Sequence, residues 1–285
     1  MSISTELTTL STNITNAYNA IQTKGGAIPT NKNTENLETA INSISSYENS
    51  LRDMISNHTF MTSVDFPSGI TSIGDYAFLY CTSLALTSLP SSITSIGSNA
   101  FYGCPSLALT SLPSSITSIS DYAFYGCTSL ALTSLPSSIT SIGSNAFKDC
   151  TSLALTSLPS SITSIGSSAF DSCTSLALTS LPNEITSIDS YAFDGCTKLA
   201  LTSLPSGITS IGSSSFRKCT SLTLLRIGSN IQKIGMRAFD GCTNLTTIYI
   251  NLPRATVEAM SYYGSKWGAT NATIICNDDA GWVEA

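Results

Sequence analysis

The chain has 285 residues, long enough for one large domain or two. Charged residues make up 11% of it, against roughly 25% in a typical globular protein, and serine and threonine fill the polar positions instead. The formal net charge is -6, with only 12 Lys and Arg in total. A nucleic-acid partner is excluded on this ground, because phosphate binding needs Lys and Arg concentrated on one face.

The first residues, MSISTELTTLSTNIT, have neither the positive n-region nor the apolar h-region of a secretory signal peptide. No window approaches the roughly 20 apolar residues of a membrane span. We therefore expect synthesis in the cytoplasm and no insertion into a membrane. In that reducing compartment the odd number of nine cysteines favours free thiols over a disulfide framework.

Residues 1–57 predict two helices, each with one apolar seam. Gly25 and Gly26 end the first helix, and Asn33 caps the second, with Glu35 in its positive first turn. The seams are Leu7, Leu10, Ile14, Ala17 and Ile21, then Leu37, Ile41, Ile44, Leu51 and Ile55. Each helix is short for a free-standing coiled coil. Two alternatives remain open, a helical hairpin folded on itself or on the following segment, and a short coiled coil for docking or homo-oligomerisation.

Residues 58–250 form an array with a period of 23 residues. Prolines, phenylalanines and cysteines recur in one phase, which gives eight full repeats and the strand of a ninth. The cysteines of the array are Cys81, Cys104, Cys127, Cys150, Cys173, Cys196, Cys219 and Cys242. A repeat of this length cannot bury its apolar side chains alone, so the array must gain its core by stacking coils.

One unit, LALTSLPSSITSIGSNAFKDCTS at 130–152, shows how a coil is built. We expect Pro136 to end a strand, because proline cannot donate to a ladder, and Gly143 to turn the chain. The spacing of Phe147 and Cys150 predicts a single helical turn. Beyond the array, residues 251–285 break the period. They predict a C-terminal cap with a short helix after Pro253 and a strand in ATIIC at 272–276.

The in-phase Leu, Pro, Ile, Ile, Gly, Ala-Phe and Cys resemble the BspA-like class of leucine-rich repeats, over about two thirds of the chain. The resemblance implies a right-handed solenoid with a parallel β-sheet on one side, used in bacterial surface and adhesion proteins for binding or as a spacer. It implies no catalysis and no cofactor.

The six central repeats depart from that class, whereas the outer strands follow it. The central strands read LALTSLP, so their middle apolar residue lies one position earlier and a threonine takes its place. Strict strand alternation would point Leu132 and Ser134 outward and Thr133 inward. The alternative is a bulge or bend that turns the leucines into the core and starts the strand only at the threonine. The first arrangement would give a contact surface made of Leu86, Ser88, Leu109, Ser111, Leu132, Ser134, Leu155, Ser157, Leu178, Ser180, Leu201 and Ser203.

The cysteine series does not predict a metal site. Consecutive thiols lie one coil apart, in a line with the roughly 4.8 Å spacing of neighbouring strands, whereas zinc needs four ligands around one point. Parallel Cβ vectors also disfavour disulfides. We expect small buried apolar thiols in the array and at Cys276.

Catalysis finds little support. The only histidine is His58, ahead of the first coil, and the acidic residues are scattered on turns. No phosphate-binding glycine loop is present. The sequence thus predicts a non-enzymatic protein without metal or cofactor.

Differences between repeats fall around the turn that carries Ala-Phe and Cys, whereas Thr-Ser on the sheet is the same in all six central strands. Such a sheet fits a spacer or a periodic adhesive of low specificity. The alternative is that the repeats arose by recent duplication and have not yet diverged in sequence. Residues 24–44 also resemble short N-terminal modules of phage and prophage tail-associated proteins. We therefore expect a structural or binding protein that contacts a protein or a surface glycan, tail-associated and located in a virion, or alternatively a cell-surface adhesin.

Overall fold

The structure is a computed structural model that describes residues 62–66 and 69–283. The two helices expected in residues 1–57, and any oligomerisation through them, lie outside the described residues. Within the described part no helix is long and apolar enough to cross a membrane.

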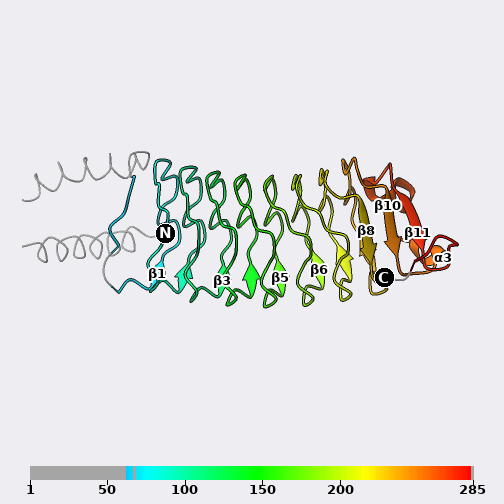
Figure 1. Ribbon diagram of the computed structural model, residues 1–285, viewed down its shortest axis with the longest axis horizontal. Coiled ribbons are helices and arrows are strands. Elements are labelled where there is room, and N and C mark those ends of the chain that lie inside the picture. The colour runs from blue at the N-terminus through cyan, green and yellow to red at the C-terminus, as the bar shows by residue number, and fades with distance from the viewer. Residues whose placement is uncertain (1–61, 67–68, 284–285) are drawn as a thin grey trace, which may run out of the picture. The chain divides into compact units, whose positions relative to one another are not determined.

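Residues 69–250 form a solenoid of stacked coils, and its two-residue strands pair in parallel in three separate sheets (Figure 1). The pairs are 23 residues apart, as in Ser141↔Ser164 and Ile142↔Ile165, so the period of the sequence is the length of one coil. The short strands are β1 (Ser72–Ile73), β2 (Ser95–Ile96), β3 (Ser118–Ile119), β4 (Ser141–Ile142), β5 (Ser164–Ile165), β6 (Ser187–Ile188), β7 (Ser210–Ile211) and β9 (Lys233–Ile234).

These strands are short because they occupy a single side of the coil between two turns. In β4 the isoleucine is buried and the serine faces outward, which is the alternation of a strand with one face on the core. Backbone bonds extend each pairing by a residue at either end, for example from Thr140 N to Thr117 O and from Gly143 N to Ile119 O.

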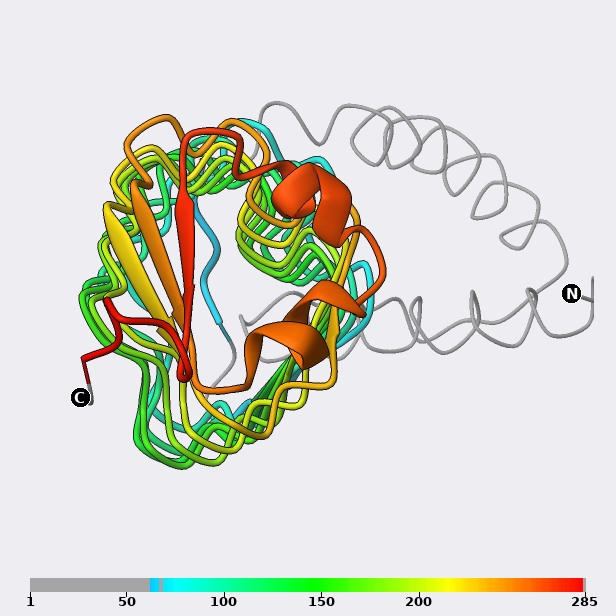
Figure 2. The same ribbon diagram turned by 90° about the vertical axis from the view of Figure 1, so that its right-hand side faces the viewer.

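Longer strands occur only near the C-terminal end. There β8 (Leu224–Ile227), β10 (Thr247–Ile250) and β11 (Thr273–Cys276) form one parallel sheet in the order β8-β10-β11. Figure 2 looks along the stack from this end and shows the sheet on one side of the coil. Thr247 and Ile248 pair with Leu224 and Leu225, in the same 23-residue register as the rest of the array.

The core runs the whole length of the solenoid and repeats with the coils. Phenylalanine rings from Phe78 to Phe239 form one continuous stack, with centroids 5.2–5.8 Å apart. Beside them lie the cysteines. Each from Cys104 to Cys242 directs its Sγ to a phenylalanine carbonyl 26 residues earlier, as Cys150 does to Phe124 O at 3.0 Å. The expected turn between Phe147 and Cys150 is confirmed by a bond from Cys150 N to Phe147 O.

The expected strands in the six LALTSLP segments are wrong, apart from a single bridge, and the five segments from Leu107 to Leu204 show why. There the chain bends at the threonine, no strand forms, and regular pairing begins only after the proline. Only one or two backbone bonds join neighbouring segments, such as Ala154 N to Leu132 O at 3.2 Å, and Ser203 forms an isolated bridge with Arg226. The bend lets Leu132 and Leu135 both point inward, which straight alternation forbids.

The segment after Ile250 closes the C-terminal end of the stack. The expected helix and strand are confirmed as α3 (Arg254–Glu258) and β11, with the 3-10 helix η2 (Tyr263–Gly268) between them. Trp267 is fully buried, and its carbonyl accepts a bond from Phe239 N, the position that a further coil would otherwise occupy. The backbone of the last coil is therefore paired rather than left as an open edge.

Candidate binding surfaces

The first candidate is the outward side of the LALTSLP segments, which we call the hydroxyl face. In each of the six segments threonine and serine are adjacent and both are exposed. The face consists of Thr87, Ser88, Thr110, Ser111, Thr133, Ser134, Thr156, Ser157, Thr179, Ser180, Thr202 and Ser203.

The leucines expected on that face are not part of it. Leu109, Leu132, Leu155, Leu178 and Leu201 are buried, with at most 1% of each side chain exposed, and Leu86 is half-buried. The alternative, a bend that turns them into the core, describes these positions correctly. Burying one leucine is worth about 1.5–3 kcal/mol, so a bend that buries this leucine outweighs the ladder bonds it gives up, each worth about 0.5–1.5 kcal/mol net.

The hydroxyls of this face differ from the threonine hydroxyls of the next side of the coil. There Thr94, Thr140 and Thr163 donate through Oγ1 to the threonine carbonyl of the preceding coil, at 3.1–3.3 Å. On the hydroxyl face, in contrast, none of the 12 side chains makes a hydrogen bond to another described residue. These hydroxyls are therefore available both to donate and to accept.

The hydroxyl face carries no charge over six coils, since the segments from Leu84 to Leu204 contain only Leu, Ala, Thr, Ser and Pro. The first charged residue beyond it is Arg226. This neutrality disfavours a partner that binds through ion pairs.

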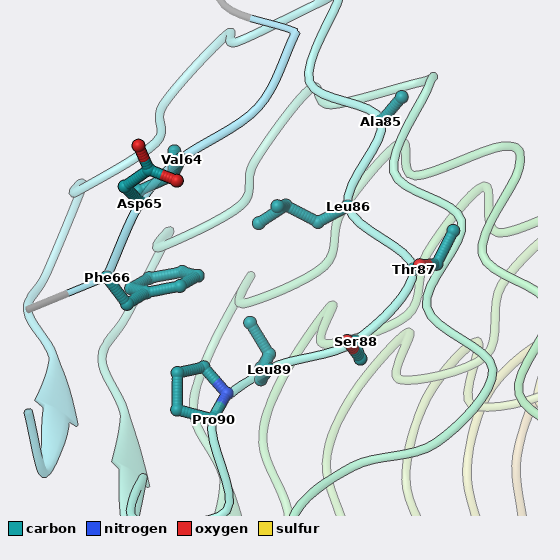
Figure 3. Close-up of a pocket in the computed structure, with 9 residues that line it drawn as sticks. All are labelled: Val64, Asp65, Phe66, Ala85, Leu86, Thr87, Ser88, Leu89 and Pro90. Atoms are coloured by element: carbon teal, nitrogen blue, oxygen red, sulfur yellow. The ribbon is translucent and has the colours of Figure 1, made fainter. Parts of the chain in front are cut away.

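A crevice of about 500 Å³ lies at the N-terminal end of the hydroxyl face. Figure 3 shows Phe66 and Leu86 pointing toward one another across it, with Val64 on the Phe66 side and Leu89 on the other. Thr87 and Ser88 point away from it. The crevice explains why Leu86 is only half-buried whereas its five equivalents are fully covered.

A second crevice, of about 240 Å³, lies at the other end of the face and is lined by Ser203, Leu204, Arg226, Asn251 and Trp282 among others. The Arg226 guanidinium lies 4.3 Å above the Tyr249 ring and donates to Val283 O at 2.8 Å. Trp282 packs edge-on against the same ring. The C-terminal residues thus fold back on the outer face of the β8-β10-β11 sheet.

The third feature is the turn ridge, the outward residues of the turns between the glycine and the cysteine of each coil. Its side chains change from coil to coil and pair across coils. Lys148 Nζ lies 2.9 Å from Asp171 Oδ2, and Arg217 binds Asp194 through two nitrogens at 2.7–3.0 Å. The bond to Asp171 raises the pKa of Lys148. Lys148 and Arg217 thus compensate the negative charges of Asp171 and Asp194, which are both buried.

At its N-terminal end the ridge is aromatic. Tyr102 and Tyr125 stack with centroids 4.4 Å apart, Tyr80 meets Tyr102 edge-on at 5.3 Å, and Tyr122 lies 6.2–6.3 Å from both stacked rings. We call these four residues the tyrosine cluster. Burial, together with the neighbouring phenols, raises the pKa of Tyr102. Burial and the nearby Asp149 carboxylate raise the pKa of Tyr125.

The arrangement of the cluster depends on one glycine. Gly103 has a positive φ of 68°, and a Cβ there would lie 2.6 Å from the Tyr80 ring. Asp149, Ser172 and Lys218 adopt the same positive φ at the equivalent positions of other coils, so it is the close approach of the Tyr80 ring that favours glycine here.

The cysteines have the environment that the sequence predicts. All nine are free and buried, and burial raises the pKa of Cys104 and Cys242 to about 12. Over residues 62–66 and 69–283 no three His, Cys, Asp or Glu side chains are grouped as a metal site requires.

Sequence reasoning missed the tyrosine cluster and the Arg226 crevice. The sequence does show that the repeats differ at this turn. The rings that meet, however, come from different positions of successive repeats, so a comparison of equivalent positions does not bring them together. Tyr80 follows Phe78 by two residues, whereas Tyr102 follows Phe101 by one. For the crevice no periodic signal existed, because Trp282 lies beyond the array.

Comparison with solved structures finds related repeat proteins. A leucine-rich repeat protein from Bacteroides ovatus is 26% identical over 75% of this chain and 66% of its own, with a TM-score of 0.43. The leucine-rich repeat protein of T. pallidum is 28% identical over 75% of this chain and 86% of its own, with a TM-score of 0.48. A leucine-rich cell surface protein from Faecalibacterium prausnitzii is 21% identical over 78% and 87%, with a TM-score of 0.30.

At these TM-scores the likenesses carry no argument about function, and no curated protein matches the chain. The decisive finding is a family model. The model of the BspA type leucine-rich repeat region, in six copies, matches residues 49–177 and 175–274. These ranges cover well over half of the sequence and include every coil described above. The chain therefore belongs to the BspA type leucine-rich repeat family.

Proposed function

We propose that this chain is a non-enzymatic binding protein of a bacterial cell surface and that its hydroxyl face holds a neutral glycan. One observation carries the proposal. Six successive coils present the same exposed Thr–Ser pair, with no hydrogen bond from these hydroxyls to another described residue. Membership of a family that the sequence resemblance associates with surface adhesion supports the cell-surface setting.

A glycan suits this face better than a folded protein does. A sugar offers many hydroxyls, which pair with side chains that both donate and accept. Specific protein interfaces instead have a buried core of aromatic and aliphatic anchors, and the hydroxyl face has none, because its leucines point inward. Identical chemistry in successive coils also suits a polymer whose own units repeat.

The tail-associated alternative rests on residues 24–44, which lie outside the described residues. The family match and the related structures give it no support, so the cell-surface function is preferred here.

The test removes hydroxyls without disturbing the coils. The variant replaces Ser111, Ser134 and Ser157 by alanine, and its matched control replaces three serines of the adjacent side, Ser118, Ser141 and Ser164. Since none of the six serine side chains makes a hydrogen bond to another described residue, each change should alter the free energy of unfolding by less than about 0.5 kcal/mol.

Retention of the whole chain is measured on a panel of immobilised neutral polysaccharides, with acidic ones for comparison. The wild type and the control variant should be retained on a neutral polysaccharide. The hydroxyl-face variant should bind it roughly tenfold more weakly, as expected for three lost hydrogen bonds. If the wild type binds no polysaccharide, or both variants bind alike, the glycan role is wrong.

A further inference from the structure

The turn ridge is where the coils differ from one another. The hydroxyl face repeats without change, so it cannot distinguish one segment of the solenoid from another. At the ridge, the residue after the core phenylalanine is Tyr102, Tyr125, Lys148, Asp171, Asp194 and Arg217 in successive coils. Lys148, Asp171, Asp194 and Arg217 are consumed in ion pairs between coils. The tyrosines at the N-terminal end of the ridge take no part in these ion pairs and form its one cluster of aromatic rings among the described residues.

The tyrosine cluster exposes much of its aromatic surface. Tyr80 is 55% exposed and Tyr122 is 37% exposed. Each ring packs against the stacked pair of Tyr102 and Tyr125. Tyr76, in the same coil as Tyr80, is 58% exposed. Five of the eleven tyrosines of the chain thus lie in three adjacent coils, and exposed aromatic patches of this kind are typical of interaction sites.

The surroundings of the cluster are acidic. Asp75 and Asp121 directly precede Tyr76 and Tyr122, and each accepts the N–H of a serine in the next coil through Oδ1 at 2.7 Å. Asp149 lies beside Tyr125. The adjacent cation, Lys148, is already held by Asp171. The patch therefore combines aromatic rings with three carboxylates and no free cation among the described residues that form it.

We propose that the tyrosine cluster binds a basic segment of a protein partner, with Arg or Lys side chains placed over the rings and beside the carboxylates. Cations bind over aromatic faces with about 0.5–1 kcal/mol at exposed sites and about 2 kcal/mol when desolvated. Carboxylates at the rim add charge complementarity and steer the approach. The inference rests on the proposed function in that the solenoid binds a partner, but it assigns protein recognition to a different surface from the hydroxyl face.

A glycan is the less suitable occupant of this patch. The exposed rings of Tyr80 and Tyr122 could pack against either a sugar or a cation, so the charge of the surroundings decides between the two. A neutral sugar can donate hydroxyl hydrogen bonds to the three carboxylates, but it carries no charge to pair with them, as an Arg or Lys side chain does.

The repeats supply substitutions that the fold already accepts. Tyr122→Asn introduces the residue that Asn99 and Asn145 provide at the same position of neighbouring coils, and Tyr80→Gly introduces the residue of Gly103. The matched control is Tyr191→Asn. Tyr191 occupies the position of Tyr122 with the same backbone conformation, φ 59° against 56°, and is 43% exposed. It has no ring contact with another described aromatic residue.

The probe is a fluorescent peptide of alternating Gly and Arg, with a Gly-Ser peptide and a neutral polysaccharide as comparisons, measured on the full chain by fluorescence anisotropy. The wild type and Tyr191→Asn should bind the Arg peptide alike. The double variant Tyr80→Gly, Tyr122→Asn should bind it at least about tenfold more weakly, which corresponds to about 1.4 kcal/mol. Unchanged far-UV circular dichroism and thermal midpoints confirm that the coils are intact.

Equal binding of the Arg peptide by the double variant and the wild type would refute the inference, and so would stronger binding of the polysaccharide at the cluster than of the peptide. The three-serine variant of the hydroxyl face separates the two proposals. It should lose polysaccharide and keep the peptide, so a failure at the cluster leaves the glycan role standing, and the reverse also holds.

Discussion

The thiols of the array are unreactive because they are buried, and those from Cys104 to Cys242 also donate a hydrogen bond to a phenylalanine carbonyl. The Cys127, Cys150, Cys173, Cys196 and Cys219 side chains are fully covered, and burial raises the pKa of each well above its usual range. Only the thiolate reacts. With a pKa of about 12, as for Cys104, roughly one thiol in 10,000 is ionised at pH 8.

We therefore expect the native chain at pH 8 to react very slowly with an aromatic disulfide reagent. Nine thiols should become reactive at once in concentrated guanidinium chloride, with one equivalent released per cysteine. Among the native thiols, Cys81 and Cys276 should react first, because they lie in the first coil and in the terminal strand β11. Rapid labelling of Cys150 in the folded chain, detected by peptide mass spectrometry, would contradict the burial described here.

At the scale of the element, the sequence predicts the positions that repeat in phase and misses those that depend on a bend. Ile142, Phe147 and Cys150 could be assigned to the core because each recurs every 23 residues and nothing competes for that place. Leu132 could not be assigned with certainty, because the alternation rule holds only while both neighbouring strands stay extended. The bend at Thr133 reverses the rule locally, and its cause is the balance between burial and pairing rather than any residue with special backbone preferences.

The C-terminal cap depends on a single arginine. The Arg254 side chain binds the Asp279 carboxylate, the Tyr263 hydroxyl at 3.1 Å and the Ile274 carbonyl at 3.0 Å, and so ties α3, η2 and β11 together. The hydrogen bond to Arg254 lowers the pKa of Asp279 below its ordinary value of 3.8. A carboxylate with a lowered pKa stabilises the fold above its ordinary pKa, and that contribution is lost as the pH falls through the lowered value.

Tryptophan fluorescence tests this cap, because Trp267 and Trp282 are the only two tryptophans of the chain. We expect a change in emission below pH 3.8, at a pH where circular dichroism still reports intact coils. Arg254→Met should show the acid-type emission already at pH 7 and no acid transition. Arg237→Met, which alters an exposed arginine of the last coil without a side-chain partner among the described residues, should behave as the wild type. An acid transition that survives in Arg254→Met would mean that Asp279 is not the responsible group.

For the whole molecule, stacking of equivalent coils implies that one 23-residue unit can be removed without changing the register. Each coil contacts only its neighbours, so stability is approximately a sum of coil and interface contributions. Deletion of residues 108–130 joins Leu107 to Ala131, and deletion of residues 131–153 joins Leu130 to Ala154. Both restore the normal sequence across the junction and leave 262 residues (285 minus 23). We expect both shortened chains to fold and to unfold cooperatively.

The two deletions should differ in stability because the turn ridge is not uniform. Deletion of residues 108–130 brings Tyr102 beside Lys148 and leaves both ion pairs in place. Deletion of residues 131–153 removes Lys148 and puts Tyr125 in its place, so the buried carboxylate of Asp171 loses its cation. An unpaired buried charge costs about 1–3 kcal/mol or more, so the second chain should have the lower free energy of unfolding in guanidinium chloride. Equal stabilities would show that coils are interchangeable regardless of their ridge residues, and the ridge would then have no part in holding neighbouring coils together.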